Sequence, residues 1–342
     1  MNNGTKGGIK NKMIIEKKCR KRKEWIDALR AIAMIFVLMW HYIGKANPIM
    51  PYIAPLMIPL FFAITGYVFN DSRTNQLEFF KNIFYKLIIP WIILTLFPEL
   101  LAGVLKIGDR SINSVLYNFI SGINLWYLPC LIVAEIVWFY VRRNIKKNEI
   151  LLVVIIFISV FGLILSKYDI LTFAMINRAF TVQFFIFLGY IIKINEKAIA
   201  NLNLQNVFLL VFTYVVLVAV YSNCIKGEIF DVHTAYYPYF PYPILEIVIG
   251  IVVAFSVAIK IRKIPKFLTF IGRNTLVFYT INGYVSLILN GVLNKVNIVN
   301  EDGIIFKSMF ILLICIGCSI GAFCINRFAP WIVGKKKTRQ NS

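Results

Sequence analysis

The sequence predicts an all-α integral membrane protein, a polytopic bundle of about ten transmembrane helices with both termini in the cytoplasm. Of its 342 residues, 59% are hydrophobic and only 15% are charged, which leaves too little polar surface to cover a water-exposed globule. Its apolar runs are long enough to cross a hydrocarbon core of roughly 30 Å as helices. The 29 Phe and 17 Tyr suit lipid-facing and interfacial positions.

Ten apolar runs are the predicted spans, and together they form one membrane domain over residues 25–333. Basic tails flank this domain at 1–24 and 334–342. The N-terminal tail is polar and leads directly into a full-length span, so we expect no cleavable signal peptide. The predicted spans are Trp25–Ile43, Tyr52–Phe69, Phe84–Leu105, Leu125–Val141, Ile150–Leu165, Ala179–Ile192, Val207–Tyr221, Ile244–Ile261, Phe267–Leu289 and Ile305–Phe323.

The orientation follows from the basic residues, because short cytoplasmic loops hold an excess of Lys and Arg. These residues gather in both tails and in the loops after the even-numbered spans. The loops after odd-numbered spans contain fewer Lys and Arg residues. The first holds Lys45 alone, and in another Glu228 and Asp231 offset the charge of Lys226. The net charge of +21 therefore reflects membrane topology rather than a nucleic-acid partner. We expect a multi-pass protein of the cell membrane, such as a bacterial inner membrane.

The cysteines do not predict a metal site or a disulfide framework. Most of the six lie in apolar segments, where a thiol behaves as a small hydrophobe. Cys315 and Cys318 form a CxxC motif, but the surrounding run 311–324 supplies no second ligand pair.

The first predicted span carries three ionisable residues, Asp27, Arg30 and His41. Such groups are costly within a membrane, so each is a functional hypothesis by default. Arg30 and His41 are eleven positions apart, which puts them on nearly one helix face and about 16 Å apart along the axis. Asp27 lies one turn before Arg30 and can pair with it. The alternative is that Asp27 and Arg30 only mark the interface and that His41 bonds to a loop.

These residues and several motifs resemble the membrane acyltransferase-3 family, which includes O-acetyltransferases of bacterial surface polysaccharides. The first span has Asp-x-Leu-Arg ending at Arg30 and ten residues between Arg30 and His41. The resemblance covers nearly the whole chain. Its other motifs are Phe61-Phe62-Ala-Ile-Thr65-Gly66-Tyr67, Leu125-Trp126-Tyr127-Leu128, Phe185-Ile-Phe-Leu-Gly189-Tyr190 and Ile271-Gly272-Arg273-Asn274-Thr275-Leu276.

The chain departs from the family pattern at two places. Members often have Ser-Gly-Phe where this chain has Thr65-Gly66-Tyr67, which keeps a hydroxyl and an aromatic ring. The ninth span of members often carries a His after Tyr, whereas here Tyr279-Thr-Ile is followed by Asn282. Any proton transfer by that His is therefore absent from this chain.

The resemblance implies acyl-CoA, such as acetyl-CoA, as a cytoplasmic donor substrate, no tightly bound cofactor, and a carbohydrate or lipid-linked sugar as acceptor. We expect His41 to act as general base, because imidazole has an ordinary pKa near 6.5. Arg30 would bind the donor phosphates or the acyl carbonyl, with Asp27 as its partner. Since Arg30 and His41 are about 16 Å apart, the donor would stretch between them in a channel. A two-step route through an acylated His41 is the alternative.

Further residues are expected to bind substrate. Phe62 and Thr65 belong to the second-span motif, and Trp126 lies at the outer end of the fourth span. Either Glu135, within the fourth span, or Glu246, early in the eighth, could orient the base or pair with Arg178, near the outer start of the sixth. Purely structural pairing is the alternative for both.

Two more groups are candidate binding residues. Arg273 and Asn274, on the cytoplasmic side of the ninth span, are placed to meet CoA phosphates, although an ordinary positive-inside residue also explains Arg273. Tyr236 and Tyr237 belong to an outer segment that is dense in rings, which suits a sugar but also an interfacial aromatic belt. His233, in the same segment, is the only other His.

Two other classes of function compete with an enzyme. A transporter or flippase of a glycan or glycolipid would also use ten spans and buried charges. The sequence shows no inverted repeat and no matching pair of broken helices to favour it. A scaffold without catalysis would leave Arg30 and His41 without a reason. The sequence identifies neither the acceptor sugar nor whether it is lipid-linked or part of a finished polymer.

Overall fold

A computed structural model describes residues 22–70, 75–104, 111–224, 228–295 and 303–335. The predicted all-α polytopic bundle is confirmed, because these ranges fold into helices joined by loops and contain no strand. Their one β-type contact is an isolated bridge between Asp231 and Tyr236. The helical elements are α2 (Glu24–Tyr42), α3 (Met50–Ile53), η1 (Ala54–Leu56), α4 (Ile58–Val68), α5 (Gln76–Ile83), η2 (Phe84–Ile88), α6 (Ile89–Val104), α7 (Ile112–Ser121), α8 (Tyr127–Asn144), α9 (Asn148–Lys167), η3 (Phe173–Met175), α10 (Ile176–Thr181), α11 (Gln183–Ile194), α12 (Glu196–Ala200), α13 (Leu204–Cys224), α14 (Tyr242–Lys260), α15 (Lys266–Arg273), α16 (Thr275–Lys295), α17 (Ile304–Phe328) and η4 (Pro330–Val333).

Within the described ranges, eight helices are long and apolar enough to cross a membrane, or nine if the bent pair α10–α11 forms one span. The predicted ten also include α8, whose 18 residues carry Glu135, Arg142 and Arg143. Ten spans therefore stay a prediction. The predicted spans coincide with helices of the structure, with differences in three of them. The third predicted span lies in a helical run that already begins at Gln76, and the sixth is bent by 50° between α10 and α11. The third difference is in the ninth span. That span is broken at Asn274 into α15 and α16.

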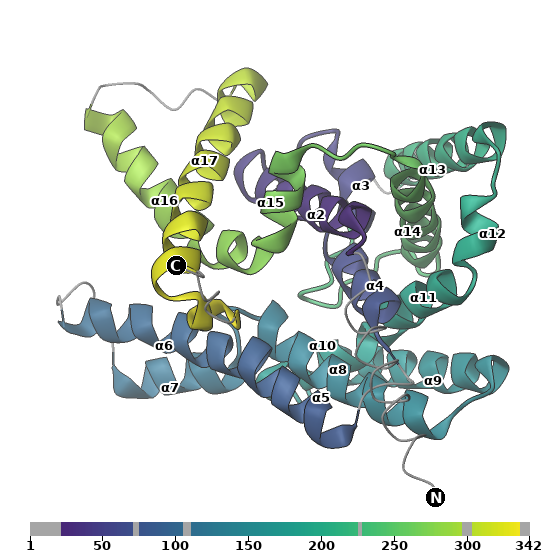
Figure 1. Cartoon of the computed structure of the whole chain (residues 1–342), viewed down its shortest axis with the longest axis horizontal. Helices are drawn as coiled ribbons and strands as arrows, with labels where there is room; N and C mark the ends of the chain where they lie inside the picture. The colour runs from purple at the N-terminus through teal and green to yellow at the C-terminus, as the bar shows by residue number, and fades with distance from the viewer. Residues whose placement is uncertain (1–21, 71–74, 105–110, 225–227, 296–302, 336–342) are drawn as a thin grey trace, which may run out of the picture.

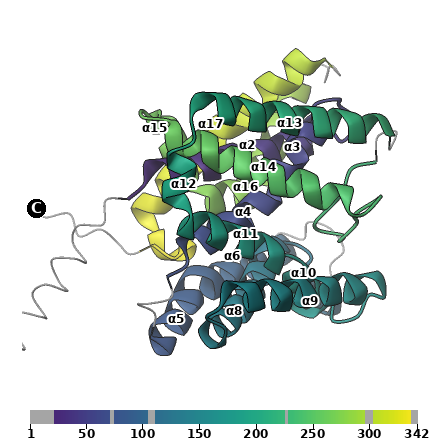
Figure 2. The same cartoon turned by 90° about the vertical axis from the view of Figure 1, so that its right-hand side faces the viewer.

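Helix α2 lies at the centre of the bundle. It packs against α4, α14, α15, α16 and α17, and Figure 1 shows it between the α16–α17 pair and the α13–α14 pair. In Figure 2 the long helices run in broadly the same direction across the view, as expected for a bundle that crosses a bilayer. Side chains of α2 therefore face the interior of the bundle along much of its length.

The closest helix crossings lie at glycines of the family-like motifs. A Cβ on Gly66 of α4 would lie 1.8 Å from the carbonyl oxygen of Ile186, and one on Gly189 of α11 would lie 1.7 Å from that of Ala63. These two helices are thus in backbone contact, which only residues without a side chain permit. Gly272 likewise brings α15 against α2, where an added Cβ would lie 1.8 Å from the carbonyl oxygen of Asp27.

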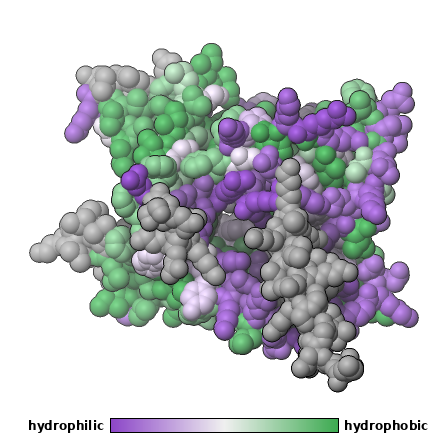
Figure 3. All heavy atoms as spheres, viewed as in Figure 1, coloured by the Kyte–Doolittle hydropathy of each residue, from purple (hydrophilic) through white to green (hydrophobic). Residues whose placement is uncertain are grey.

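One end of the bundle carries a charged face. In Figure 3 hydrophilic residues cover the centre and right of this face, while hydrophobic residues dominate over α16, α17 and α6. The first and last described segments meet here: Arg22 donates to Asp27, Asp27 accepts from Arg273, and the adjoining Asn274 accepts from Lys335. Both ends of the described chain are therefore on the same side, as the prediction of two cytoplasmic termini requires. We refer to this side as the inner end.

Candidate active site

At the inner end, Asp27 is the centre of an ion cluster. It is 1% exposed, and its Oδ1 accepts from Arg22 Nη2 at 2.6 Å. Its Oδ2 accepts from Arg273 Nε at 3.1 Å. The predicted partner, Arg30, lies with Nη1 3.8 Å from Oδ1, which confirms the pairing within α2. Three guanidinium groups thus surround one carboxylate, and the excess of positive charge suits a polyanionic ligand.

An inner cavity of about 280 Å³ begins beside this cluster. Arg30, Lys86 and Glu135 supply its charged groups, and Thr65 and Tyr127 supply hydroxyls. Lys86 reaches the cavity from the π-helical turn η2. Apolar side chains line most of the remaining wall, and Lys86 is an exposed residue at the edge of the cavity.

At the other end of α2, His41 faces two further cavities. The outer cavity, about 120 Å³, is also lined by Trp40, Trp126 and His233. The side cavity, about 390 Å³, adds Glu99 and other polar residues. His41 is exposed, and no hydrogen bond to it is found in the part of the chain that the structure describes. The alternative in which His41 bonds to a loop is therefore not supported there.

Tyr279 of α16 lines the inner, outer and side cavities alike. Its hydroxyl accepts a hydrogen bond from the backbone N–H of Tyr127 at 3.4 Å. Val37 and Ile58 are likewise shared between the inner and outer cavities. The cavities of Arg30 and His41 thus adjoin each other at these side chains, in the order that the predicted channel needs.

Residues 228–241, between α13 and α14, form the outer wall and contain the predicted aromatic segment. The ring of His233 lies 4.9 Å from that of Trp126, and burial lowers the pKa of His233. Tyr236 is exposed and donates to Glu228 Oε2 at 2.7 Å. Tyr237 faces away from the outer cavity and lines a different, apolar groove. Of the two tyrosines, neither lines the cavity of His41.

The structure distributes the other predicted residues over both ends. Thr65 lines the inner cavity and donates to its own helix at Phe61. Phe62 is fully buried against Tyr127. Glu135 lies in the inner cavity, whereas Arg178 donates from Nε to the carbonyl oxygen of His233 at 2.8 Å.

Arg273 and Asn274 belong to the inner end, as predicted from their side of the span. The Arg273 side chain is 47% exposed beside Asp27, which leaves part of it open to a ligand. Asn274 is 4% exposed, and its Oδ1 accepts from Lys335 at 2.6 Å and from Asn326 at 2.8 Å. Burial, with Arg22 and Arg273 nearby, lowers the pKa of Lys335. Asn274 thus ties the α15–α16 break to the end of the described chain.

The polar residues of the inner cavity that sequence reasoning missed include Lys86, Tyr127 and Tyr279. Lys86 looks in sequence like an ordinary positive-inside residue, because the π-helical turn that aims it inward has no sequence signal. Tyr127 belongs to a family-like motif, and Tyr279 lies where the ninth span departs from the family pattern, which was the available signal for them.

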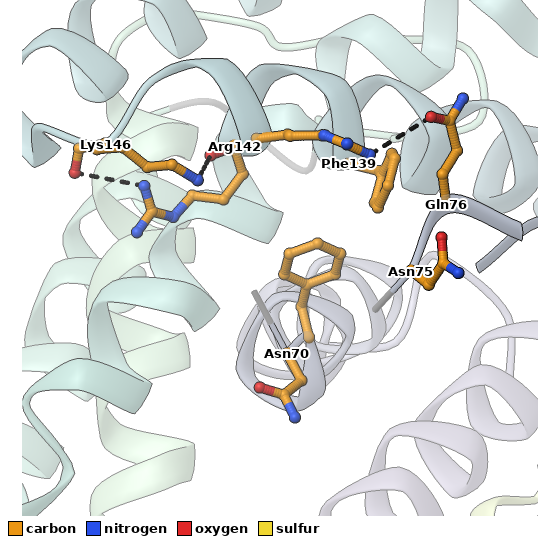
Figure 4. A pocket seen from close by; sticks show the side chains of 8 residues that line it. Asn70, Asn75, Gln76, Phe139, Arg142 and Lys146 are labelled. Atoms are coloured by element: carbon orange, nitrogen blue, oxygen red, sulfur yellow. Dashed lines mark hydrogen bonds between the residues drawn. The ribbon is translucent and has the colours of Figure 1, made fainter. Parts of the chain in front are cut away.

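A separate basic cleft of about 290 Å³ lies where α4 and α8 end and α5 begins (Figure 4). Arg143 Nη1 approaches Gln76 Oε1 at 3.4 Å, and Arg142 Nη1 approaches the Lys146 carbonyl oxygen at 3.3 Å. Phe139 and Asn70 also line this cleft. No lining residue of this cleft is a nucleophile or a general base at neutral pH, so it is not the reaction centre.

A bundle of long apolar helices with ionisable side chains in internal cavities is typical of a multi-pass membrane protein. The chain belongs to the acyltransferase-3 family, because the family profile for the acyltransferase domain matches residues 23–327. It is therefore a membrane acyltransferase, and the transporter and scaffold interpretations lose their support. Comparison with curated proteins and with solved structures gave no match.

Proposed function

We propose that this protein is an O-acyltransferase of the cell membrane. It moves an acetyl or similar acyl group from acyl-CoA to a hydroxyl of a cell-envelope carbohydrate, with His41 as general base. The observation that carries the proposal is that Arg30 and His41, at the two ends of α2, line adjoining cavities that share Tyr279.

The donor enters at the inner end. The phosphates of acyl-CoA are attracted by the guanidinium groups around Asp27, and Arg30 and Lys86 continue the positive charge into the inner cavity. Arg30 and His41 are about 16 Å apart along the axis, so one donor cannot reach both unless it is extended. The pantetheine arm of CoA is such an extended group, and it would bring the thioester past Tyr279 toward His41.

The reaction then needs two proton transfers, both through His41. A ring nitrogen of His41 takes the proton of the acceptor hydroxyl as its oxygen attacks the thioester carbonyl. The new C–O bond forms, the C–S bond breaks, and the departing CoA thiolate takes up the proton from the imidazolium. The unpartnered imidazole among the described residues supports this role, since a base must have its nitrogen available to substrate.

The proposal is tested by CoA release from acetyl-CoA, with purified protein in nanodiscs and extracted envelope glycans. We expect His41→Ala to lower acceptor-dependent release by about 10² to 10⁴, the typical contribution of a general base. His233→Ala is the comparison at the other histidine of the sequence, and although His233 also lines the outer cavity, its replacement should lower the release far less than His41→Ala. Equal rates for wild type and His41→Ala would remove His41 from the mechanism. No release with any acceptor would contradict the proposed function.

The same variants separate the two routes. Direct transfer gives no acylated protein, whereas a two-step route leaves acyl-His41 when acceptor is withheld. Mass spectrometry of wild type after incubation with acetyl-CoA alone distinguishes them, with His41→Ala as the blank.

A further inference from the structure

An apolar groove opens on the side of the bundle between α9, the α10–α11 bend and the start of α14. We call it the lateral groove. It has a volume of about 220 Å³, and Val160, Leu163 and Phe184 are typical of its wall. Ile156 and Val160 at its edge are 45% and 44% exposed. Since α9 is one of the helices suited to cross the membrane, these exposed apolar side chains contact hydrocarbon, and the groove is open to lipid.

Three hydroxyl side chains, Ser159, Thr181 and Tyr237, interrupt this apolar wall, and Thr181 donates to the carbonyl oxygen of Asn177. Ser159 is only 8% exposed, and both Ser159 Oγ and Tyr237 Oη are buried without a hydrogen-bond partner among the described residues. A buried hydroxyl that bonds to nothing is unfavourable. An occupant with a hydrocarbon chain and an oxygen acceptor would satisfy both the apolar wall and these hydroxyls.

Two stacked rings connect the wall of the lateral groove with the wall of the outer cavity. Tyr237 lines the groove, and Phe230 lines the outer cavity together with His41. The two rings are stacked at 5°, with centroids 6.0 Å apart. A molecule whose chain occupies the groove therefore needs to pass only this edge of the 228–241 loop to reach His41.

Arg178 lies between the two spaces. It is on α10, three residues before Thr181 of the groove, and its Nε bonds to the carbonyl oxygen of His233 in the outer cavity. Its Nη1 is buried and has no hydrogen-bond partner among the described residues. The acid of the outer cavity, Asp231, pairs instead with Lys45 at 3.4 Å. A buried guanidinium nitrogen without a hydrogen-bond partner favours contact with an anionic oxygen, such as that of a phosphate.

We propose that the acceptor is a sugar carried on a phosphate-bearing lipid. Its hydrocarbon chain occupies the lateral groove, its phosphate meets Arg178, and its sugar lies in the outer cavity opposite His41. This inference rests on the proposed function and narrows the acceptor from any envelope carbohydrate to a lipid-linked one. The lipid then delivers its sugar hydroxyl to the base without leaving the bilayer.

The first test separates acceptor classes. Protein in nanodiscs receives radiolabelled acetyl-CoA with either an organic-solvent extract of envelope lipids or the aqueous polysaccharide fraction. We expect the label in the lipid extract, in a product that stays soluble in organic solvent. Label only in polysaccharide would overturn this inference and leave the proposed function standing. Label in neither fraction would overturn the proposed function itself.

The second test fills the groove. Val160→Trp places a large ring at its edge, and Val153→Trp, on the same helix at a site that is 67% exposed and outside the groove, is the matched control. We expect Val160→Trp to raise the half-saturating amount of lipid extract about tenfold, as when roughly two methylene groups lose their contacts. Val153→Trp should leave it unchanged. Both variants should elute as wild type and bind acetyl-CoA with the same Kd. Equal transfer by the two variants would overturn the assignment of the groove.

Discussion

The two ends of α2 differ in how completely their polar groups are engaged. At the inner end the buried carboxylate of Asp27 has guanidinium groups on both oxygens, from Arg22 and Arg273. At the outer end His41 is exposed, and none of the described residues bonds to it. The inner end is thus held by interactions within the protein, whereas at the outer end the ring nitrogens of His41 are left for other molecules.

This difference in hydrogen bonding indicates which task each end of α2 serves. Fixed charges that are already compensated bind a charged donor with little rearrangement. A general base gains nothing from permanent partners, because its nitrogen must be open to the reacting hydroxyl. Substitutions at the inner end should therefore change stability and donor binding, and the substitution of His41 should change turnover alone.

The largest effect on stability is expected at Asp27. Asp27→Ala leaves three guanidinium groups facing one another, and loss of one partner of a buried pair costs about 3–5 kcal/mol. We expect a loss of stability at the lower limit of this range, about 3 kcal/mol. The side chains of Arg22 and Arg273 are 56% and 47% exposed, so they can turn to water. Thermal unfolding in detergent measures the effect.

The control for this carboxylate lies at the outer end. Asp231 pairs with Lys45, whose side chain is 61% exposed, so Asp231→Asn should change stability by less than about 1 kcal/mol. Similar losses for Asp27→Ala and Asp231→Asn would contradict the contrast between the two ends.

A smaller loss is expected where α15 meets α2. In Gly272→Ala the new methyl would meet the backbone of Asp27 at 1.8 Å, and such overpacking costs typically about 1–3 kcal/mol. Gly291→Ala is the control on the adjoining α16, because nothing lies within 4 Å of its added Cβ. It should be neutral or stabilise by up to about 1 kcal/mol, as Ala favours a helix. A neutral Gly272→Ala would show that the two backbones separate easily.

The smallest of these effects is expected for donor binding at Arg30. Arg30→Gln removes one charged contact to the donor, so kcat/KM for acetyl-CoA should fall about tenfold, with the loss reduced at high salt. Arg327→Gln is the control, since Arg327 is an exposed residue near the same end that lines none of the cavities described above. Equal behaviour of the two variants would mean that Arg30 acts only through the general positive charge of the inner side.

Sequence alone predicted the helical bundle and the relation of residues within one helix. The spans could be located because hydropathy is a property of consecutive residues. The pairing of Asp27 with Arg30, and the placement of Arg30 and His41 toward opposite ends of one face, follow from the helical period. The bend between α10 and α11 and the break at Asn274 were not predicted, since each lies within a segment that hydropathy assigns to a single span.

The tertiary structure decided which residues meet across helices. Arg273 reaches Asp27 from 246 positions away in the chain, and Lys86 joins Arg30 and Glu135 in one cavity. The same packing turns Tyr237 away from His41 and into the lateral groove. No periodicity carries such information, because the distance between two spans depends on helix crossings, and those depend on close contacts such as Gly66 with Ile186. The sequence by itself therefore determined the class of protein and the polar residues of α2, and helix packing alone decided what surrounds them.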